Sequence, residues 1–192
     1  MQIYKPHLYF ATEGAKKEYI CTKMDDMTIF ESDDIRSVTE LRYAFTATPF
    51  GEMLTACDGH GLCFAGFVAE GGRGAALADA VRRFPCARFT ECVSAAVDPF
   101  GEVGALHLAG TEFRRRVWRA LLTVGRGERI SYSALAARAG VPRAVRAAAS
   151  AVAANPLSIV VPCHRIVRND GSTGRYYWGS DLKRRLLEWE SQ

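Results

Sequence analysis

The chain has 192 residues, of which 48% are hydrophobic and 24% charged, the composition of a soluble globular protein with one large or two small domains. No apolar run approaches the roughly 18 residues that a membrane helix needs, and residues 1–10 lack the basic region and apolar core of a secretory signal. We therefore expect no membrane association and a cytoplasmic protein, or a nuclear one if the source is eukaryotic.

The net charge of +4 is unevenly divided along the chain. Residues 101–192 carry 15 Lys and Arg against 7 Asp and Glu, whereas residues 1–100 carry 10 against 14. A basic half joined to an acidic half indicates that only the second half meets a polyanion. The alternative is a solvated surface with uneven charge.

The six cysteines are scattered, and the four histidines do not lie beside them at zinc-site spacings. Thiols in a chain without a signal sequence indicate a reducing compartment. We expect every cysteine except Cys163 to be a small buried hydrophobic residue. The sequence therefore predicts no metal site and no cofactor.

The first half of the chain has the pattern of a small α/β unit. Turn residues separate three predicted strands, at 41–47, 53–57 and 62–68. A helix with one apolar face is predicted at 75–84, and residues 85–104 are rich in loops. We assign residues 38–104 to an N-terminal α/β domain with an antiparallel sheet. Residues 1–37 are left as an unassigned extension because their apolar periodicity is weak.

The second half, residues 105–192, is predicted to be mainly helical. Thr111 is expected to cap a helix that ends at Gly125, and Ser131 to cap a second helix at 132–139. Pro142 suits the first turn of a third helix that runs to about residue 154. Two short helices joined by a Gly-Val-Pro turn indicate a helix-turn-helix.

Further along, 157–161 has the β-branched composition of a buried strand, and Asp181 is expected to cap a last helix at 182–190. The predicted fold class is thus α/β (α+β), with a small antiparallel-sheet domain followed by a winged helix-turn-helix-like domain.

The third helix has few side chains that could read a base sequence. Between Arg143 and Asn155 its polar side chains are Arg146 and Ser150, and the other residues are Ala and Val. A recognition helix in the major groove normally presents Asn, Gln, Arg or Lys to base edges. The pattern favours binding of DNA by shape and phosphates, without sequence preference and through the minor groove. The alternative is an alanine-rich helix packed in the core.

The chemical motif is the segment 161–167, Val-Pro-Cys-His-Arg-Ile-Val. A neighbouring histidine and arginine can lower the pKa of a thiol, and the thiolate is the nucleophile. On a straight strand Cys163 and His164 would point to opposite faces, so a contact between them needs a turn or a bridging water. A Cys-His pair alone is weak evidence, because most such pairs are structural.

Taken together, these segments resemble the O6-alkylguanine-DNA alkyltransferases (methylated-DNA–protein-cysteine methyltransferases). The resemblance runs from about residue 110 to 190 and is weaker over 41–104. It is carried by Ile130-Ser131-Tyr132, Val145-Arg146-Ala147, Ala154-Asn155-Pro156, Pro162–Val167, Tyr176-Tyr177-Trp178-Gly179 and Leu186-Leu187.

The resemblance implies that Cys163 accepts an alkyl group from O6-alkylguanine in a single irreversible transfer, with O4-alkylthymine as an open alternative substrate. It implies that His164 takes the thiol proton through a water and that Glu190 orients the histidine. Asn155 would brace the turn around the cysteine, and Tyr132 would serve guanine N3. Such a protein is a single-use DNA repair enzyme.

A base inside a duplex must be flipped out to reach a buried thiol. The resemblance implies that Arg146 fills the vacated space and that Arg143 contacts phosphate, and it places Ala147 and Ser150 on the same DNA-binding helix. Around the guanine it implies three pocket residues, Tyr176, Tyr177 and Ile166. Tyr176 stacks on the base, the Tyr177 N–H contacts O6, and the carbonyl of Ile166, together with that of Cys163, accepts from the amino group. The expected partner is double-stranded DNA, bound by a monomer.

The chain departs from the family pattern in three respects. Some members carry a structural zinc in the N-terminal domain, for which this sequence shows no ligand set. Bifunctional relatives add a zinc-binding sensor and a second DNA-binding region, for which 192 residues leave no room. Tyr177 is bulkier than the residue common at its position, which could narrow the pocket and favour methyl groups.

Three other functions remain as alternatives. A non-enzymatic member of the same fold would recognise damage without the cysteine, and Cys163 is present. A helix-turn-helix regulator would need base-reading side chains on its third helix. A cysteine hydrolase would share the Cys-His chemistry but gives no reason for a basic, alanine-rich helix.

Overall fold

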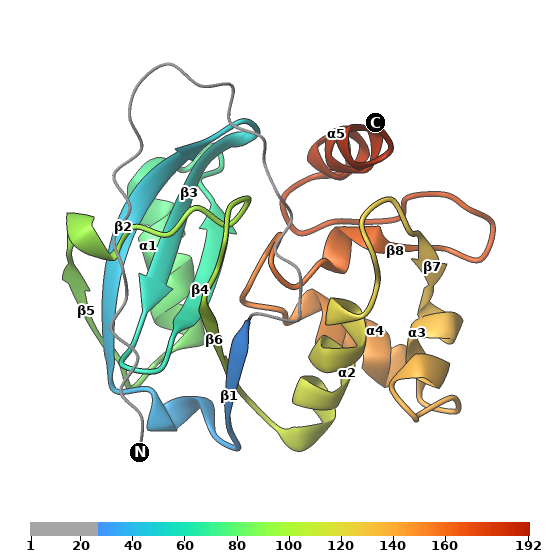
Figure 1. Cartoon of the computed structure of the whole chain (residues 1–192), viewed down its shortest axis with the longest axis horizontal. Helices are drawn as coiled ribbons and strands as arrows, with labels where there is room; N and C mark the ends of the chain where they lie inside the picture. Colours follow the sequence, from blue (N-terminus) through green and yellow to red (C-terminus); the bar gives the residue numbers. More distant parts are fainter. Residues whose placement is uncertain (1–26) are drawn as a thin grey trace.

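The computed structural model describes residues 27–192, which form a mixed sheet with helices on one of its faces and beyond one of its edges (Figure 1). Residues 1–26, most of the predicted extension together with Cys21, lie outside the described part. The sheet has six strands in the order β1-β6-β4-β3-β2-β5. Their bounds are β1 Thr28–Ser32, β2 Glu40–Thr48, β3 Gly51–Cys57, β4 Leu62–Phe67, β5 Arg88–Glu91 and β6 Ala105–Ala109.

The three strands predicted from the sequence are present as an antiparallel meander, β2-β3-β4. Gly51 has φ +124°, a conformation that favours glycine, and it allows the tight turn between β2 and β3. Every residue of β4 is buried, as its apolar composition requires. Helix α1 (Gly72–Arg83) covers one face of the sheet, at the place predicted for a helix.

The other three strands were not predicted, and each pairs in parallel with a strand distant in sequence. β5 lies in the segment expected to be loop and pairs with β2, while β1 pairs with β6. β1 lies within residues 1–37, where no element was expected, and β6 lies at the start of the segment assigned to the second domain. Glu31 and Asp33, at the end of β1, form ion pairs with Arg115 of the basic half.

Four α-helices gather beyond the β1 and β6 edge of the sheet (Figure 1). They are α2 Glu112–Leu122, α3 Tyr132–Arg138, α4 Val145–Ala153 and α5 Ser180–Glu190. The predicted caps of the first two are confirmed, because Thr111 accepts from the Arg114 N–H and Ser131 accepts from the Ala134 N–H. The Trp118 indole N–H donates to the Ala151 carbonyl at 2.9 Å and ties α2 to α4.

Several local predictions were wrong. Residues 157–161 form a turn rather than a strand, with Ile159 at φ +75°. The third helix begins at Val145, three residues after Pro142. Gly179, with φ +96°, precedes the last helix at its N-cap position, so Asp181 lies inside the first turn.

The turn at 157–161 is held by partners that are remote in sequence. The Ala65 N–H donates to the Pro156 carbonyl and the Ser158 N–H donates to the Ala65 carbonyl, both at 2.9 Å, which fastens the segment to β4. β-branched residues favour strands only where a continuous ladder is available, and here a single bridge, between Ala65 and Leu157, forms. The turn therefore joins the sheet to the helical half.

The exposure of the cysteines also differs in part from the expectation. Cys63 is buried and Cys57 and Cys92 are half-buried, but Cys86 is exposed. Across residues 27–192, no helix has the length and apolar character to cross a membrane.

Candidate active site

Cys163 lies in a short 3-10 helix, η4 (Cys163–Arg165), between the 157–161 turn and strand β8 (Ile166–Val167). β8 pairs in parallel with β7 (Ile130–Ser131), which leads directly into α3. This pairing brings the cysteine segment next to Tyr132, the first residue of α3. Cys163 itself is 9% exposed, and Val161 and Ile166 on either side are fully buried.

Burial raises the pKa of the Cys163 thiol, and the side chains of Asn155 and Tyr176, followed by the Lys183 ammonium, oppose that shift by less. A neighbouring histidine and arginine can lower the pKa of a thiol, but here burial outweighs the opposing effects and the net shift of the Cys163 pKa is upward. A charged thiolate is poorly stabilised in an apolar interior. The resting cysteine is thus a thiol, and its reaction as a nucleophile needs a base.

Because η4 is a turn and not a straight strand, Cys163 and His164 are not forced to point to opposite faces. The imidazole is 1% exposed, and its Nε2 lies 2.9 Å from Oε1 of Glu190 at the end of α5. The same carboxylate accepts from Arg165, at 3.0 Å to Nε and 2.7 Å to Nη2. Although burial alone would raise the pKa of Glu190, the bonds from His164 and Arg165 lower it to about 2.

The protonation of His164 follows from this environment. Burial lowers the pKa of the imidazole, and the adjacent carboxylate offsets only part of the shift. At neutral pH the ring is uncharged, and with Nε2–H donated to Glu190 the Nδ1 lone pair is an acceptor. Within residues 27–192, Nδ1 is buried and has no hydrogen-bond partner. It is therefore available as a proton acceptor.

Asn155 holds the turn that leads to the cysteine. Its Oδ1 accepts from the Leu157 N–H at 3.0 Å, and its Nδ2 donates to the Val161 carbonyl at 2.8 Å. The side chain is 6% exposed, so these bonds are shielded from water. Asn155 thereby replaces the ladder bonds that a strand at 157–161 would have made.

Sequence reasoning missed the buried Lys183, and it considered Arg165 only as a neighbour of the thiol and not as a partner of Glu190. Lys183 is 1% exposed and donates from Nζ to the Ile166 carbonyl at 2.5 Å, and burial lowers its pKa to about 8. Arg165 is 4% exposed and also donates to the Val124 carbonyl. A signal for the lysine was present, because it occupies the helical face of α5 formed by residues 183, 186, 187 and 190.

Of the predicted pocket residues, Tyr132 and Tyr176 lie near Cys163, since, beside burial, the thiol contributes to the pKa shifts of both hydroxyls, whereas Tyr177 contacts Asp79 on α1. Tyr132 is half-buried, and burial raises the pKa of its hydroxyl, so it remains a proton donor. The Tyr176 ring is half-buried with its hydroxyl atom inside the protein, and Ile166 is fully buried. Tyr177 is 56% exposed. The Lys183 bond to the Ile166 carbonyl leaves that oxygen one lone pair for another donor.

The predicted DNA-binding residues share one surface of the helix-turn-helix. Arg143, Arg146, Ala147 and Ser150 are all exposed, whereas Ala148 on the opposite side of α4 is buried. The helix thus satisfies both sequence-based interpretations, because one side packs in the core and the other presents small residues and arginine to solvent.

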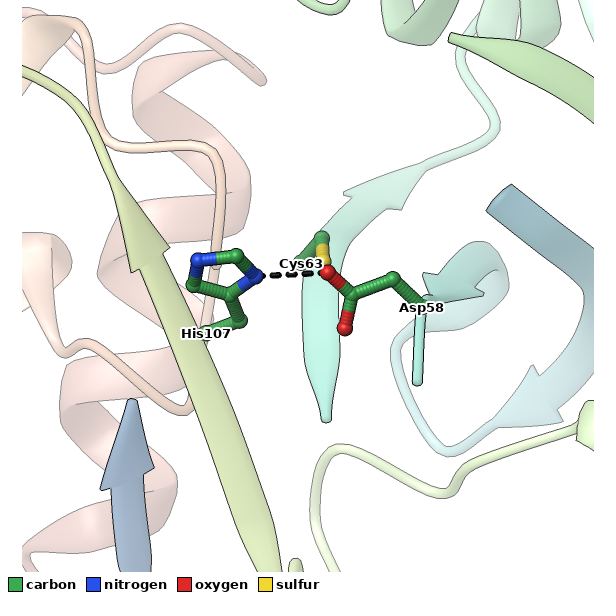
Figure 2. A group of neighbouring side chains, drawn as sticks. All are labelled: Asp58, Cys63 and His107. Atoms are coloured by element: carbon green, nitrogen blue, oxygen red, sulfur yellow. Dashed lines mark hydrogen bonds and ion pairs between the residues drawn. The ribbon is translucent and has the colours of Figure 1, made fainter. Parts of the chain in front are cut away.

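Outside this site, Asp58, Cys63 and His107 bring ligand atoms within 4.8 Å of one another (Figure 2). The sequence showed no such set, since the three residues come from separate strands and turns. Structural zinc takes four ligands, mainly thiolate and imidazole, and in residues 27–192 this group supplies three. Both ring nitrogens of His107 already have partners, Asp58 at 2.6 Å and Ser32 at 3.0 Å. These residues alone therefore do not complete a zinc site.

The fold and site define a class of protein in which a helix-turn-helix carries a buried cysteine with a neutral histidine and a carboxylate beside it. Comparisons with known proteins agree with this class. Residues 112–192 match the family described as 6-O-methylguanine DNA methyltransferase, DNA binding domain. The chain is 39% identical over 164 residues to the regulatory protein Ada of Salmonella typhimurium, covering 79% of this chain and 46% of that protein.

Solved structures extend the similarity to the sheet. The crystal structure of Mycobacterium tuberculosis OGT in complex with DNA superimposes with a TM-score of 0.63 at 32% identity, covering 79% of this chain and 92% of that one. The O6-methylguanine-DNA methyltransferase of Pyrococcus kodakaraensis gives 0.58 at 26% identity, covering 79% and 99%. The chain belongs to the O6-alkylguanine-DNA alkyltransferase family. It spans about half the length of the curated relatives that it matches first.

Proposed function

We propose that this protein repairs DNA by transferring an alkyl group from O6-alkylguanine to Sγ of its own Cys163, once per molecule. The observation that carries the proposal is the buried thiol followed by a neutral His164, whose Nε2 is fixed by Glu190 and whose Nδ1 is a free acceptor among the described residues. Relatives that share this fold are named methylated-DNA–protein-cysteine methyltransferases.

The proposed reaction begins with deprotonation of the thiol. His164 accepts the proton at Nδ1 through a bridging water, and the thiolate attacks the alkyl carbon in line with its bond to O6. The S–C bond forms as the C–O6 bond breaks, and the electron pair of that bond passes to guanine. Tyr132 donates to guanine N3, which stabilises the leaving base as it regains a proton. The thioether product has no route back to the thiol.

Access to the base is proposed to occur by flipping it out of the duplex. Arg146 would fill the space that the flipped base leaves in the duplex, and Arg143 would contact a phosphate. The small side chains of Ala147 and Ser150 would allow the DNA backbone along the minor groove to come close to α4. The exposure of all four residues on one surface supports this assignment. The proposed partner is thus double-stranded DNA, bound without sequence preference. The protein would act in the cellular compartment that contains this DNA.

The proposed guanine pocket lies between Tyr176, the Tyr177 N–H and the carbonyls of Cys163 and Ile166. These carbonyls would accept from the guanine amino group, which adenine lacks, so they favour guanine. The chemistry uses side chains of the protein and requires no cofactor. We further propose that the protein acts as a monomer of two units, in which the sheet unit supports a helical unit that carries the DNA surface and the thiol.

A stoichiometric repair assay tests this proposal. A duplex that contains O6-methylguanine is incubated with increasing protein, and the remaining lesion is counted after the reaction stops. We expect one lesion removed per protein molecule, no removal by Cys163→Ala, and full removal by Cys86→Ala, which alters an exposed cysteine elsewhere. Binding of the damaged duplex without removal of the lesion would contradict the proposal and favour damage recognition instead.

A further inference from the structure

A buried carboxylate on α1 contacts one residue of the proposed pocket. Asp79 is 6% exposed, and its Oδ1 accepts a hydrogen bond of 2.9 Å from the Tyr177 hydroxyl. α1 covers the sheet, whereas Tyr177 lies in the segment that precedes α5. The bond therefore joins the sheet unit to the substrate side of the helical unit.

Two arginines of α1 extend this contact. Arg83 donates from Nε to Asp79 Oδ2 at 3.0 Å, and its guanidinium carbon lies 5.0 Å from the centre of the Tyr177 ring. Its Nη1 reaches the carbonyl of Ala154 at 3.5 Å, immediately before the Asn155 turn. Arg82 pairs with Asp79 and donates to the Tyr177 hydroxyl at 3.3 Å. One end of α1 thus touches both the pocket segment and the turn that supports the cysteine.

The pocket segment bends at a glycine at each end, so an anchor between the two glycines helps to fix its position. Gly174 and Gly179 flank it with φ +67° and +96°, and glycine has the widest range of backbone conformations. Trp178 is held by its indole N–H, which donates to Ser158 Oγ at 2.7 Å. Tyr177 is more than half exposed, and its hydroxyl donates to Asp79. Arg82 and Arg83, which contact the hydroxyl and the ring, both pair with Asp79, so the contacts that hold Tyr177 against α1 converge on this carboxylate.

We infer that Asp79 is a positioning residue for alkyl transfer: through the Tyr177 hydroxyl it fixes residues 176–179 so that the Tyr177 N–H stands where guanine O6 is bound. The inference rests on the proposed function of the site. The inference also assigns the large side chain of Tyr177 a role other than narrowing the pocket. The side chain is directed toward α1, and its contacts there set the position of the Tyr177 backbone.

Hydrogen–deuterium exchange tests the contact without requiring activity. Tyr177→Phe removes the hydroxyl and keeps the ring, and Glu52→Gln is the matched control because it removes the bond between Glu52 and Arg73 near the other end of α1. Loss of a hydrogen bond to a charged acceptor should raise exchange of a peptide spanning 174–179 about 10-fold in Tyr177→Phe. The control should match the wild type there. Equal exchange in all three proteins would overturn the inference.

A second variant separates positioning from a general structural role. If Asp79 acts through the hydroxyl, Asp79→Ala, which removes the acceptor that Asn would retain, raises exchange at 174–179 in the wild-type background but adds nothing to Tyr177→Phe. An additive increase would show that Asp79 acts on the segment by another route and would contradict the inference.

The transfer rate completes the test. At saturating methylated duplex, Tyr177→Phe should react about 3- to 10-fold more slowly, with the DNA concentration for half-maximal rate unchanged. A normal saturated rate despite faster exchange would overturn the positioning role. If the wild type transferred no methyl group, the proposed function would be contradicted. The hydrogen–deuterium exchange of residues 174–179 would still decide whether Asp79 holds this segment in place.

Discussion

Replacing Glu190 by Gln should destabilise the protein strongly, because two buried side chains, a neutral imidazole and a guanidinium, share this carboxylate as their hydrogen-bond acceptor. His164 and Arg165 both donate to it, and all three residues are at most 8% exposed. These bonds lower the carboxyl pKa from 4.5 to about 2 against the effect of burial. At 1.36 kcal/mol per pKa unit, the charge contributes about 3 kcal/mol to the free energy of unfolding at neutral pH.

This contribution has a defined pH dependence. The folded pKa of Glu190 lies below the unfolded value, so the stabilisation is complete above pH 4.5 and is lost as the pH falls toward 2. Glutamine cannot titrate and lacks the stabilisation at every pH. The difference between wild type and Glu190→Gln should therefore be about 3 kcal/mol at pH 7 and should shrink below pH 4.5.

Urea denaturation at several pH values measures this difference. Glu188→Gln is the matched control, since Glu188 lies on the same helix with an exposed side chain whose partner is Arg184 at 3.3 Å. An exposed pair of this kind contributes at most about 0.5 kcal/mol. If Glu190→Gln and Glu188→Gln cost the same, or if the cost of Glu190→Gln does not change with pH, the account of the buried pair is wrong.

Four further outcomes are expected. Asn155→Ala should lower the free energy of unfolding by about 2–4 kcal/mol in urea denaturation, because two buried backbone groups lose their partners; a loss under 1 kcal/mol would contradict the bracing role. Arg143→Ala should weaken binding to all duplex sequences and reduce the slope of log affinity against log salt by about 1, whereas an unchanged slope would remove Arg143 from the phosphate contacts. Arg146→Ala should slow transfer from a duplex at least about tenfold but leave reaction with the free base unchanged, and equal losses on both substrates would argue against flipping. Because burial lowers the pKa of His164, the transfer rate should stay level from pH 8 down to about 6.5 and decline only at lower pH, as stopped time courses would show.

The sequence predicted those features that depend on local pattern. Alternating and continuous apolar residues located β2, β3 and β4, and the hydroxyls of Thr111 and Ser131 marked two helix starts that the structure confirms. The Pro-Cys-His-Arg motif predicted the segment that carries the proposed nucleophile. Local signals of this kind are sufficient because a helix satisfies most of its own backbone, and β2, β3 and β4 pair with strands that are adjacent in the chain.

The features that were missed depend on partners far away in the chain. β1 and β6 form a parallel pair across 77 positions (Thr28 with Ala105), which no local pattern reveals. Residues 157–161 have strand composition, yet Asn155 and Ala65 take up their backbone bonds and produce a turn. The direction of the Cys163 pKa shift could not be predicted either, because it depends on burial among residues that the fold assembles.

The central claim is that Cys163, and none of the other five cysteines, receives the alkyl group. It is tested most directly by mass spectrometry of peptides after reaction with a duplex that contains O6-methylguanine, with total methylation checked on the intact protein. We expect one methyl group per molecule, located on the peptide that contains Cys163. We expect no methyl group on the Cys163→Ala variant, in which His164 is unchanged. Methylation of Cys86 or of several cysteines, or an unmodified protein after the lesion has been removed, would contradict the central claim.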